Sequence, residues 1–166
     1  NADQPNSRWY SGAGIYRPVT LWTAPARHIL PDGVQVRTLS IDPAEVEVTV
    51  QTTASGAVAV AILDGEQTVA TAQAESNGKA VLRVQIPNAK LWSPDSPALY
   101  RCRAMFGDDC AETTFGVRTL SWGDGGFLLN GKRVILLGAC VHHDHGVLGA
   151  CCYPEAEERK VRLLQK

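Results

Sequence analysis

Residues 45–52, EVEVTVQT, place Val46, Val48 and Val50 between charged or polar neighbours. Successive side chains of an extended strand point to opposite faces. The three valines therefore share one face and the polar side chains share the other. This pattern predicts a β-strand with one side on a core and the other in water.

Two later stretches, KAVLRVQI (79–86) and ALYRCRAMF (98–106), repeat this alternation. Short groups of turn-favouring residues separate the apolar runs. They are Pro31-Asp32-Gly33, Asp64-Gly65, Asn77-Gly78 and Gly107-Asp108-Asp109. Roughly seven strands about ten residues apart, with no helical period among them, are typical of an immunoglobulin-like sandwich. The sequence therefore predicts an all-β, immunoglobulin-like antiparallel β-sandwich.

The charge balance excludes two classes of partner. The chain has 16 Lys and Arg against 17 Asp and Glu, a net charge of -1, and its basic residues do not cluster. Nucleic acids and anionic membrane surfaces attract basic patches, so we expect no nucleic-acid partner and no membrane partner. The longest apolar runs, such as residues 58–63, are far shorter than the roughly 20 residues of a membrane-spanning helix.

The C-terminal part carries different signals. Asn130-Gly131 is typical of a two-residue hairpin turn, and it lies between GFLL and KRVILLG. Further on, Pro154 suits the first position of a helix, and the glutamates after it complement the positive end of the helix dipole. A strand, a polar loop and a helix start after an all-β domain indicate an opening βα unit. We therefore expect the chain to be a truncated piece of a longer protein.

Four stretches carry a resemblance to a known family through their residues and their order along the chain. They are RWYSGAGIYRPVTL (8–21), LWSPDSPALY (91–100), FGVRTLSW with GFLLNGKRVILLG (115–138), and HHDHGVLGA (142–150). Together they resemble the family-2 glycoside hydrolases, which include β-galactosidases, β-glucuronidases and β-mannosidases. That family has a jelly-roll sugar-binding domain, an immunoglobulin-like sandwich and a (β/α)8 barrel, in this order.

The resemblance implies three parts in this chain. Residues 1–21 would be the tail of the jelly-roll domain, and residues 22–121 would be the sandwich. Residues 122–166 would be a linker hairpin and the start of the catalytic barrel, with its first strand at 136–142 and its first helix at 154–166.

The resemblance also implies where catalysis would occur. Retaining glycosidases need two carboxylates about 5 Å apart, one as acid and one as nucleophile. In this family both are glutamates on later barrel strands, which would lie beyond residue 166. We therefore expect a β-galactosidase-like parent enzyme that acts on β-glycosides, and an isolated chain with no catalytic residue. Its role would be structural, bridging the sugar-binding and catalytic domains.

Two other functions remain open from the sequence. The chain could be a free-standing carbohydrate-binding or adhesive sandwich module, which would bind sugars measurably in calorimetry. It could also be a small zinc-binding interaction protein, because GACVHHDHGVLGACC (138–152) gathers histidine and cysteine side chains. Structural zinc sites more often show paired C-x2-C or H-x3-H ligands, which this stretch lacks. We therefore expect no metal and no cofactor.

Within that stretch, His142 is the candidate substrate-binding residue. Barrel active sites gather at the C-terminal ends of the strands, and His142 falls where the first strand would end. The resemblance implies that a histidine at this position contacts the sugar. His143, Asp144 and His145 would follow it in a hydrogen-bonded loop that shapes the rim of the site.

Other conspicuous residues have simpler interpretations. Trp9, Tyr10 and Tyr16 are as compatible with burial between domains as with a sugar-stacking platform. Cys102 lies on the apolar side of its predicted strand, and we expect it to be a small buried side chain. A first barrel strand without its neighbours exposes unpaired backbone groups, so residues 136–166 are expected to pack on the sandwich or on another copy of the chain, forming a homo-oligomer.

Overall fold

A computed structural model describes residues 14–15, 18–142, 145–149, 151 and 153–166. Contacts between Cα atoms divide the chain into two compact units. One unit is Thr23–Leu136, and the other combines Asn1–Trp22 with Leu137–Lys166. Over the described positions, no helix has the length and apolar character needed to cross a lipid bilayer.

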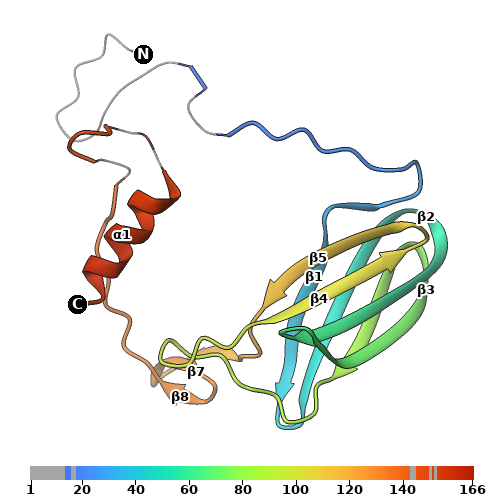
Figure 1. The fold of residues 1–166 in the computed structure, drawn as a ribbon. Helices are drawn as coiled ribbons and strands as arrows, with labels where there is room; N and C mark the ends of the chain where they lie inside the picture. The colour runs from blue at the N-terminus through green and yellow to red at the C-terminus, as the bar shows by residue number, and fades with distance from the viewer. Residues whose placement is uncertain (1–13, 16–17, 143–144, 150, 152) are drawn as a thin grey trace. The chain divides into compact units, whose positions relative to one another are not determined.

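The larger unit is built on five antiparallel strands (Figure 1). They are β1 (Ile29–Ile41), β2 (Ala44–Asp64), β3 (Gln67–Gln85), β4 (Tyr100–Phe106) and β5 (Asp109–Phe115). They form one sheet in the order β1-β2-β4-β5, and β3 also pairs with β2. The fold is therefore mostly β, as the alternating sequence pattern predicts.

The longest strand, β2, changes partners along its length. Its residues 45–51 pair with β1 and with the second half of β3. Its residues 58–63 pair instead with β4, while the first half of β3 lies on the other side. The register of β2 and β3 shifts between Gln51 and Ser55, and both strands curl in this part of the sheet (Figure 1).

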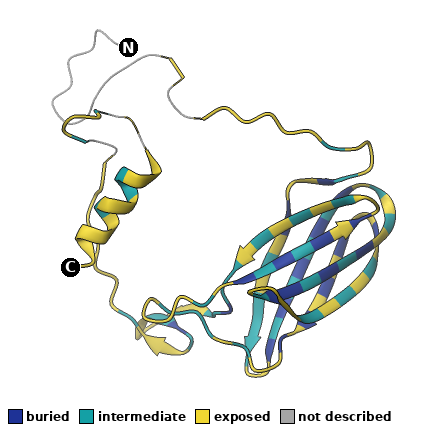
Figure 2. Ribbon diagram, viewed as in Figure 1, coloured by how far each residue is buried: buried dark blue, intermediate teal, exposed yellow. Residues whose placement is uncertain are grey.

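Because the sheet curls, the apolar faces of its two halves share one core. Val46, Val48 and Val50 from the first half of β2 join Val58, Val60 and Ile62 from its second half in a single buried cluster. The predicted inward faces of 79–86 and 98–106 belong to the same cluster, which confirms the alternation. Buried and exposed residues accordingly alternate along the strands in Figure 2.

Two of the predicted turns are wrong. Asn77-Gly78 lies inside β3, where Asn77 pairs with Ser55, and Pro31-Asp32-Gly33 lies inside β1 at a second register shift. Asp32 and Gly78 do take positive φ, at 54° and 86°. Bulges and sharply curved strands require such backbone as much as turns do, so turn-favouring residues also mark these irregularities. The curled sheet therefore has five strands in place of the predicted seven, and two of the five, β2 and β3, are long.

A hairpin follows the sheet. It consists of β6 (Leu120–Gly123), β7 (Gly126–Leu129) and β8 (Lys132–Arg133). Asn130 and Gly131 have φ of 51° and 75°, and their position between β7 and β8 confirms the predicted turn. Two positive φ angles in succession are the mark of the type I′ hairpin turn.

The side chain of Asn130 links this hairpin to the loop before β4. Its Oδ1 accepts the Thr119 N–H at 3.0 Å, and its Nδ2 donates to the Trp92 carbonyl at 3.0 Å. The Trp92 ring is half-buried, with the Arg118 guanidinium 4.4 Å from its centroid. A Cβ at Gly116 would lie 2.7 Å from that side chain, so only glycine fits there. We call Trp92, Gly116, Arg118 and Asn130 the tryptophan latch.

In the other unit, α1 (Pro154–Leu164) begins with Pro154 in its first turn, as predicted. The expected strand at 136–142 is absent, since these residues form no strand. A parallel barrel strand exists only through hydrogen bonds to neighbouring strands. None of the strands that the structure describes pairs with these residues.

Truncating the core at the second half of β2 should destabilise the sheet. Ile62 is fully buried, so we expect Ile62→Ala to lower the free energy of unfolding by about 2–5 kcal/mol. Val81 is 49% exposed on β3, and Val81→Ala should change it by about 0.5 kcal/mol or less. Urea denaturation followed by far-UV circular dichroism measures both, and equal effects would contradict the assigned core.

The tryptophan latch can be tested without disturbing its turn. Asn130→Gly keeps the positive φ but loses both side-chain hydrogen bonds, so we expect a loss of about 1–3 kcal/mol. Amide hydrogen exchange of β7 and β8 should rise with it. Asn88 also has positive φ, at 52°, and Asn88→Gly is the matched control because its side chain makes no such bonds to the described residues. Identical behaviour of the two variants would rule out the latch.

Candidate functional site

The candidate site residue His142 lies on an extended segment before α1. Its side chain is exposed, while its backbone carbonyl accepts a hydrogen bond from Lys160 Nζ of α1 at 3.0 Å. The structure therefore holds the backbone at His142 through the helix that follows it in sequence, although the expected barrel strand is absent.

His145 is held by the same face of α1. Its Nε2 lies 2.9 Å from Glu157 Oε1, and Glu157 Oε2 lies 3.4 Å from Lys160 Nζ. Reciprocal backbone bonds of 2.9 and 2.8 Å between His145 and Gly149 close a tight turn. We call His142, His145, Glu157 and Lys160 the histidine clamp. His143 and Asp144 lie outside the described residues.

The clamp changes the acidity of its carboxylate. The hydrogen bond from His145, with a smaller contribution from the charge of Lys160, lowers the pKa of Glu157 below its ordinary value of 4.5. The carboxylate therefore stays ionised at neutral pH. Its contribution to stability is present above that ordinary value and is lost as the pH falls through the lowered pKa.

The described part of the chain holds no group of three or more metal-ligating side chains. Cys140 and Cys151 are free and exposed, and Glu157 engages His145 directly. Cys152 lies outside the described residues. Among the described residues, the side chains that could bind zinc are therefore not grouped into a ligand set.

Two of the three glutamates of α1 have partners. Glu158 pairs with Arg162 one turn along α1, and Glu157 pairs with His145 and Lys160. In the larger unit, Asp109 Oδ2 accepts the Ile29 N–H at 2.7 Å and so ties β1 to the start of β5. Each of these carboxylates has a structural partner, whereas a retaining mechanism needs two that face one substrate.

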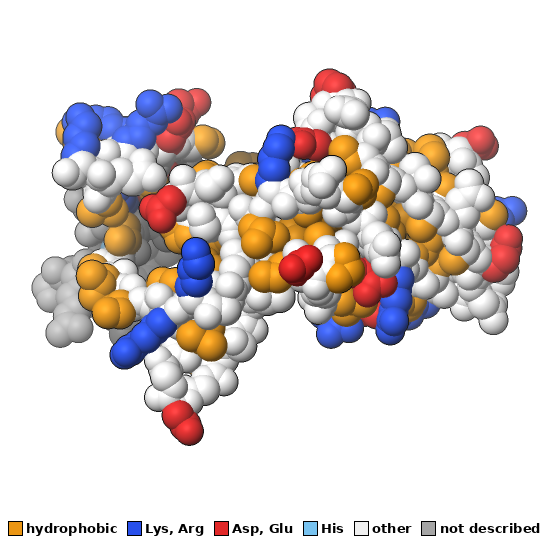
Figure 3. Space-filling view, turned by 90° about the horizontal axis from the view of Figure 1, so that it is seen from below, with side chains coloured by type: hydrophobic (Ala, Val, Ile, Leu, Met, Phe, Trp, Pro, Cys, Tyr) orange, Lys and Arg blue, Asp and Glu red, His pale blue; other side chains and the backbone are white. Residues whose placement is uncertain are grey.

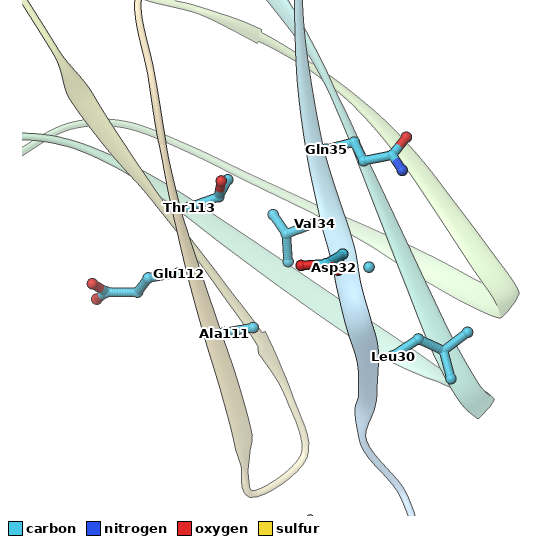
Figure 4. A pocket seen from close by; sticks show the side chains of 8 residues that line it. Leu30, Asp32, Val34, Gln35, Ala111, Glu112 and Thr113 are labelled. Atoms are coloured by element: carbon cyan, nitrogen blue, oxygen red, sulfur yellow. The ribbon is translucent and has the colours of Figure 1, made fainter. Parts of the chain in front are cut away.

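A cavity of about 380 Å³ lies between β1 and β5. Leu30, Val34, Ala111 and Thr113 contribute to its lining, and in Figure 4 the Glu112 carboxylate points away from β1. Arg103 and Arg101 both pair with Glu112 and lower its pKa. Glu112 is thus neutralised by its own sheet, and Asp32 is the other carboxylate that lines the cavity.

The remaining candidates of the sequence divide into two groups. Burial raises the pKa of Cys102 to about 11, and this side chain is fully enclosed in the core, as predicted. Trp9, Tyr10 and Tyr16 lie outside the described residues. Sequence reasoning missed Glu157 and Lys160, although their i, i+3 spacing on a predicted helix was the available signal.

Comparison with known proteins decides the family. The model of the family described as "Glycosyl hydrolases family 2" matches residues 32–118, more than half of the chain. The chain belongs to glycosyl hydrolases family 2. The matched residues span most of β1 and all of β2 to β5, so the family-2 signal lies in the curled sheet.

Individual relatives extend the match beyond the sheet. A β-galactosidase of Bacteroides ovatus is 34% identical over 187 residues, which cover 100% of the family-2 chain and 22% of the relative. A solved family-2 member from Bacteroides cellulosilyticus is 33% identical with a TM-score of 0.80, covering 95% of this chain and 25% of that one. The β-glucuronidase of Ruminococcus gnavus with bound D-glucuronic acid is 26% identical with a TM-score of 0.74, covering 85% and 25%. The family-2 chain thus spans about a quarter or less of each relative.

The clamp predicts a measurable change in the acidity of Glu157. In His145→Gln the imidazole bond is lost, so we expect the pKa of Glu157 to rise toward its ordinary value of 4.5. Carbon-detected NMR titration of the side-chain carboxyls measures this change. In Glu155→Gln, the control at the start of α1, the pKa of Glu157 should stay low. An unchanged titration of Glu157 in His145→Gln would show that the clamp does not exist in solution.

Proposed function

We propose that the chain is the non-catalytic, immunoglobulin-like domain of a longer family-2 glycoside hydrolase that acts on β-glycosides. The observation that carries the proposal is the 34% identity to a β-galactosidase over the whole length of the chain. The match covers only 22% of that β-galactosidase. The relative's name states its activity, and most of its length lies outside the match. The proposed role is to bridge the sugar-binding and catalytic domains.

The immunoglobulin-like assignment is supported by how the strands pair. β1, the first half of β2 and the second half of β3 form one half of the curled sheet. The first half of β3, the second half of β2, β4 and β5 form the other half. Counting the long strands twice gives seven antiparallel segments around one core, which is the number in a constant-type immunoglobulin sandwich.

The proposed domain limits are 1–21 for the tail of a sugar-binding jelly-roll, 22–121 for the sandwich and 122–166 for the hairpin with the start of a catalytic barrel. Helix α1 supports the last of these, because a helix after a polar loop is what a βα unit supplies. The strand of that unit would pair only in the presence of its neighbours.

Within the longer enzyme, His142 would contact the sugar. Two features support this role: the imidazole is exposed, and the backbone of the same residue is fixed by Lys160. A fixed backbone with an accessible side chain suits a group that holds a hydroxyl and orients the ring, because positioning lowers the entropic cost of reaching the transition state.

The experiment compares the chain with its full-length natural gene product. We expect the 166-residue chain to hydrolyse no nitrophenyl β-galactoside or β-glucuronide, and the full-length protein to hydrolyse at least one of them. In the full-length protein, His142→Ala should lower kcat/KM at least about 10-fold, since a hydrogen bond that strengthens in the transition state is worth upwards of about 1.5 kcal/mol. Cys151→Ser is the control and should leave it unchanged.

Two results would contradict the proposal. Hydrolysis by the isolated chain would place catalysis within these residues. A full-length protein without glycosidase activity, together with sugar binding by the isolated chain in calorimetry, would favour a free-standing carbohydrate-binding module.

A further inference from the structure

The hairpin of β6, β7 and β8 presents an apolar surface to solvent. Trp122 and Leu136 are 74% and 72% exposed, and Leu120 and Ile135 are exposed as well. The Trp122 and Phe127 rings lie against each other with centroids 5.2 Å apart. Contiguous exposed apolar surface of this kind marks an interaction site more often than a free surface.

A groove runs into this surface beside the tryptophan latch. It encloses about 230 Å³, and it is lined by Trp92, Pro94, Arg118, Leu120, Phe127, Leu129, Val134 and Leu136. Seven of these eight side chains are apolar, and Arg118 is the one charged group among them. The groove therefore suits an apolar side chain with an acidic group beside it.

The charge around the groove points to the same kind of partner. Arg118 rests on the Trp92 ring, and no carboxylate pairs with it among the residues that the structure describes. Lys132 and Arg133 line the adjoining cavity of about 700 Å³, against a single carboxylate, Asp95. Figure 3, seen from below, shows hydrophobic side chains at the surface beside both Lys or Arg and Asp or Glu side chains.

We propose that this groove docks another domain of the longer family-2 protein, through an apolar side chain seated against Leu136 and a carboxylate that meets Arg118. The inference rests on the proposed function, because it names a surface, formed by the sandwich and the hairpin after it, that would hold a neighbouring domain. The chain matches only 22% to 25% of its relatives' lengths, so these relatives contain ample polypeptide to cover such a surface.

A second copy of the chain fits the groove less well. A two-fold contact places the same patch on both sides. Arg118, Lys132 and Arg133 would then be present on both sides of one apolar contact, with Asp95 as the one acidic residue lining either cavity. Like charges in such a contact oppose association, so an acidic, apolar partner is the better occupant.

The test measures amide hydrogen exchange in β7 and β8 for the isolated chain and for the full-length gene product. We expect exchange at least about 10-fold slower in the full-length protein, because docking excludes water and restrains the hairpin. Leu136→Ser should remove that protection in the full-length protein and leave the isolated chain unchanged. Val81→Ser, which alters an exposed apolar residue of β3, is the matched control and should affect neither.

Three results would overturn the docking surface. Equal exchange in the two proteins would show an uncovered hairpin, and a gene product with no further domain would leave nothing to cover it. An isolated chain that is dimeric by light scattering, and monomeric as Leu136→Ser, would make a second copy the occupant. Loss of glycosidase activity with a protected hairpin would instead refute the proposed function and leave the docking surface standing.

Discussion

The change of partner along β2, from β1 to β4, is the constraint on which the larger unit depends. Where the register of β2 and β3 shifts, the hydroxyls of Thr52 and Ser76 lie 2.7 Å apart and are almost completely buried. Each buried hydroxyl is thereby satisfied, which matters because an unsatisfied one costs about 1–3 kcal/mol. Gly56 allows close approach at the same place, since a Cβ there would lie 3.2 Å from the Phe106 ring. The two halves of the sheet can therefore curl onto one core while these two buried hydroxyls remain hydrogen-bonded.

The tryptophan latch connects the core to the hairpin of β6, β7 and β8. Val117 is fully buried, and its carbonyl accepts the Trp92 N–H at 2.9 Å, so the loop before β4 is fixed to the chain that leaves β5. Asn130 then attaches the hairpin to that loop through its two side-chain bonds. The hairpin and the core are thus joined by directional contacts, and the apolar groove is formed where they meet.

The sequence predicts this structure well where one local pattern decides it. The alternation around Val48 identifies the buried face, and Pro154 identifies the start of α1. It fails where long-range pairing decides. Asn77-Gly78 carries a turn signal, but its pairing with β2 keeps it inside a strand. The expected strand ending at His142 fails for the same reason, because its partners would have to come from elsewhere. The contacts of the histidine clamp likewise depend on how a loop folds back onto a helix.

The histidine clamp bears on two requirements that the proposed substrate contact of His142 would impose. Its backbone must be fixed, and its side chain must be open to the ligand. Lys160 meets the first requirement at the His142 carbonyl, and Glu157 supports it by engaging both Lys160 and His145. All of these residues belong to one compact unit and come from a single stretch of about twenty residues. The described hydrogen bonds of the clamp therefore join residues of one compact unit and need no residue of the curled sheet.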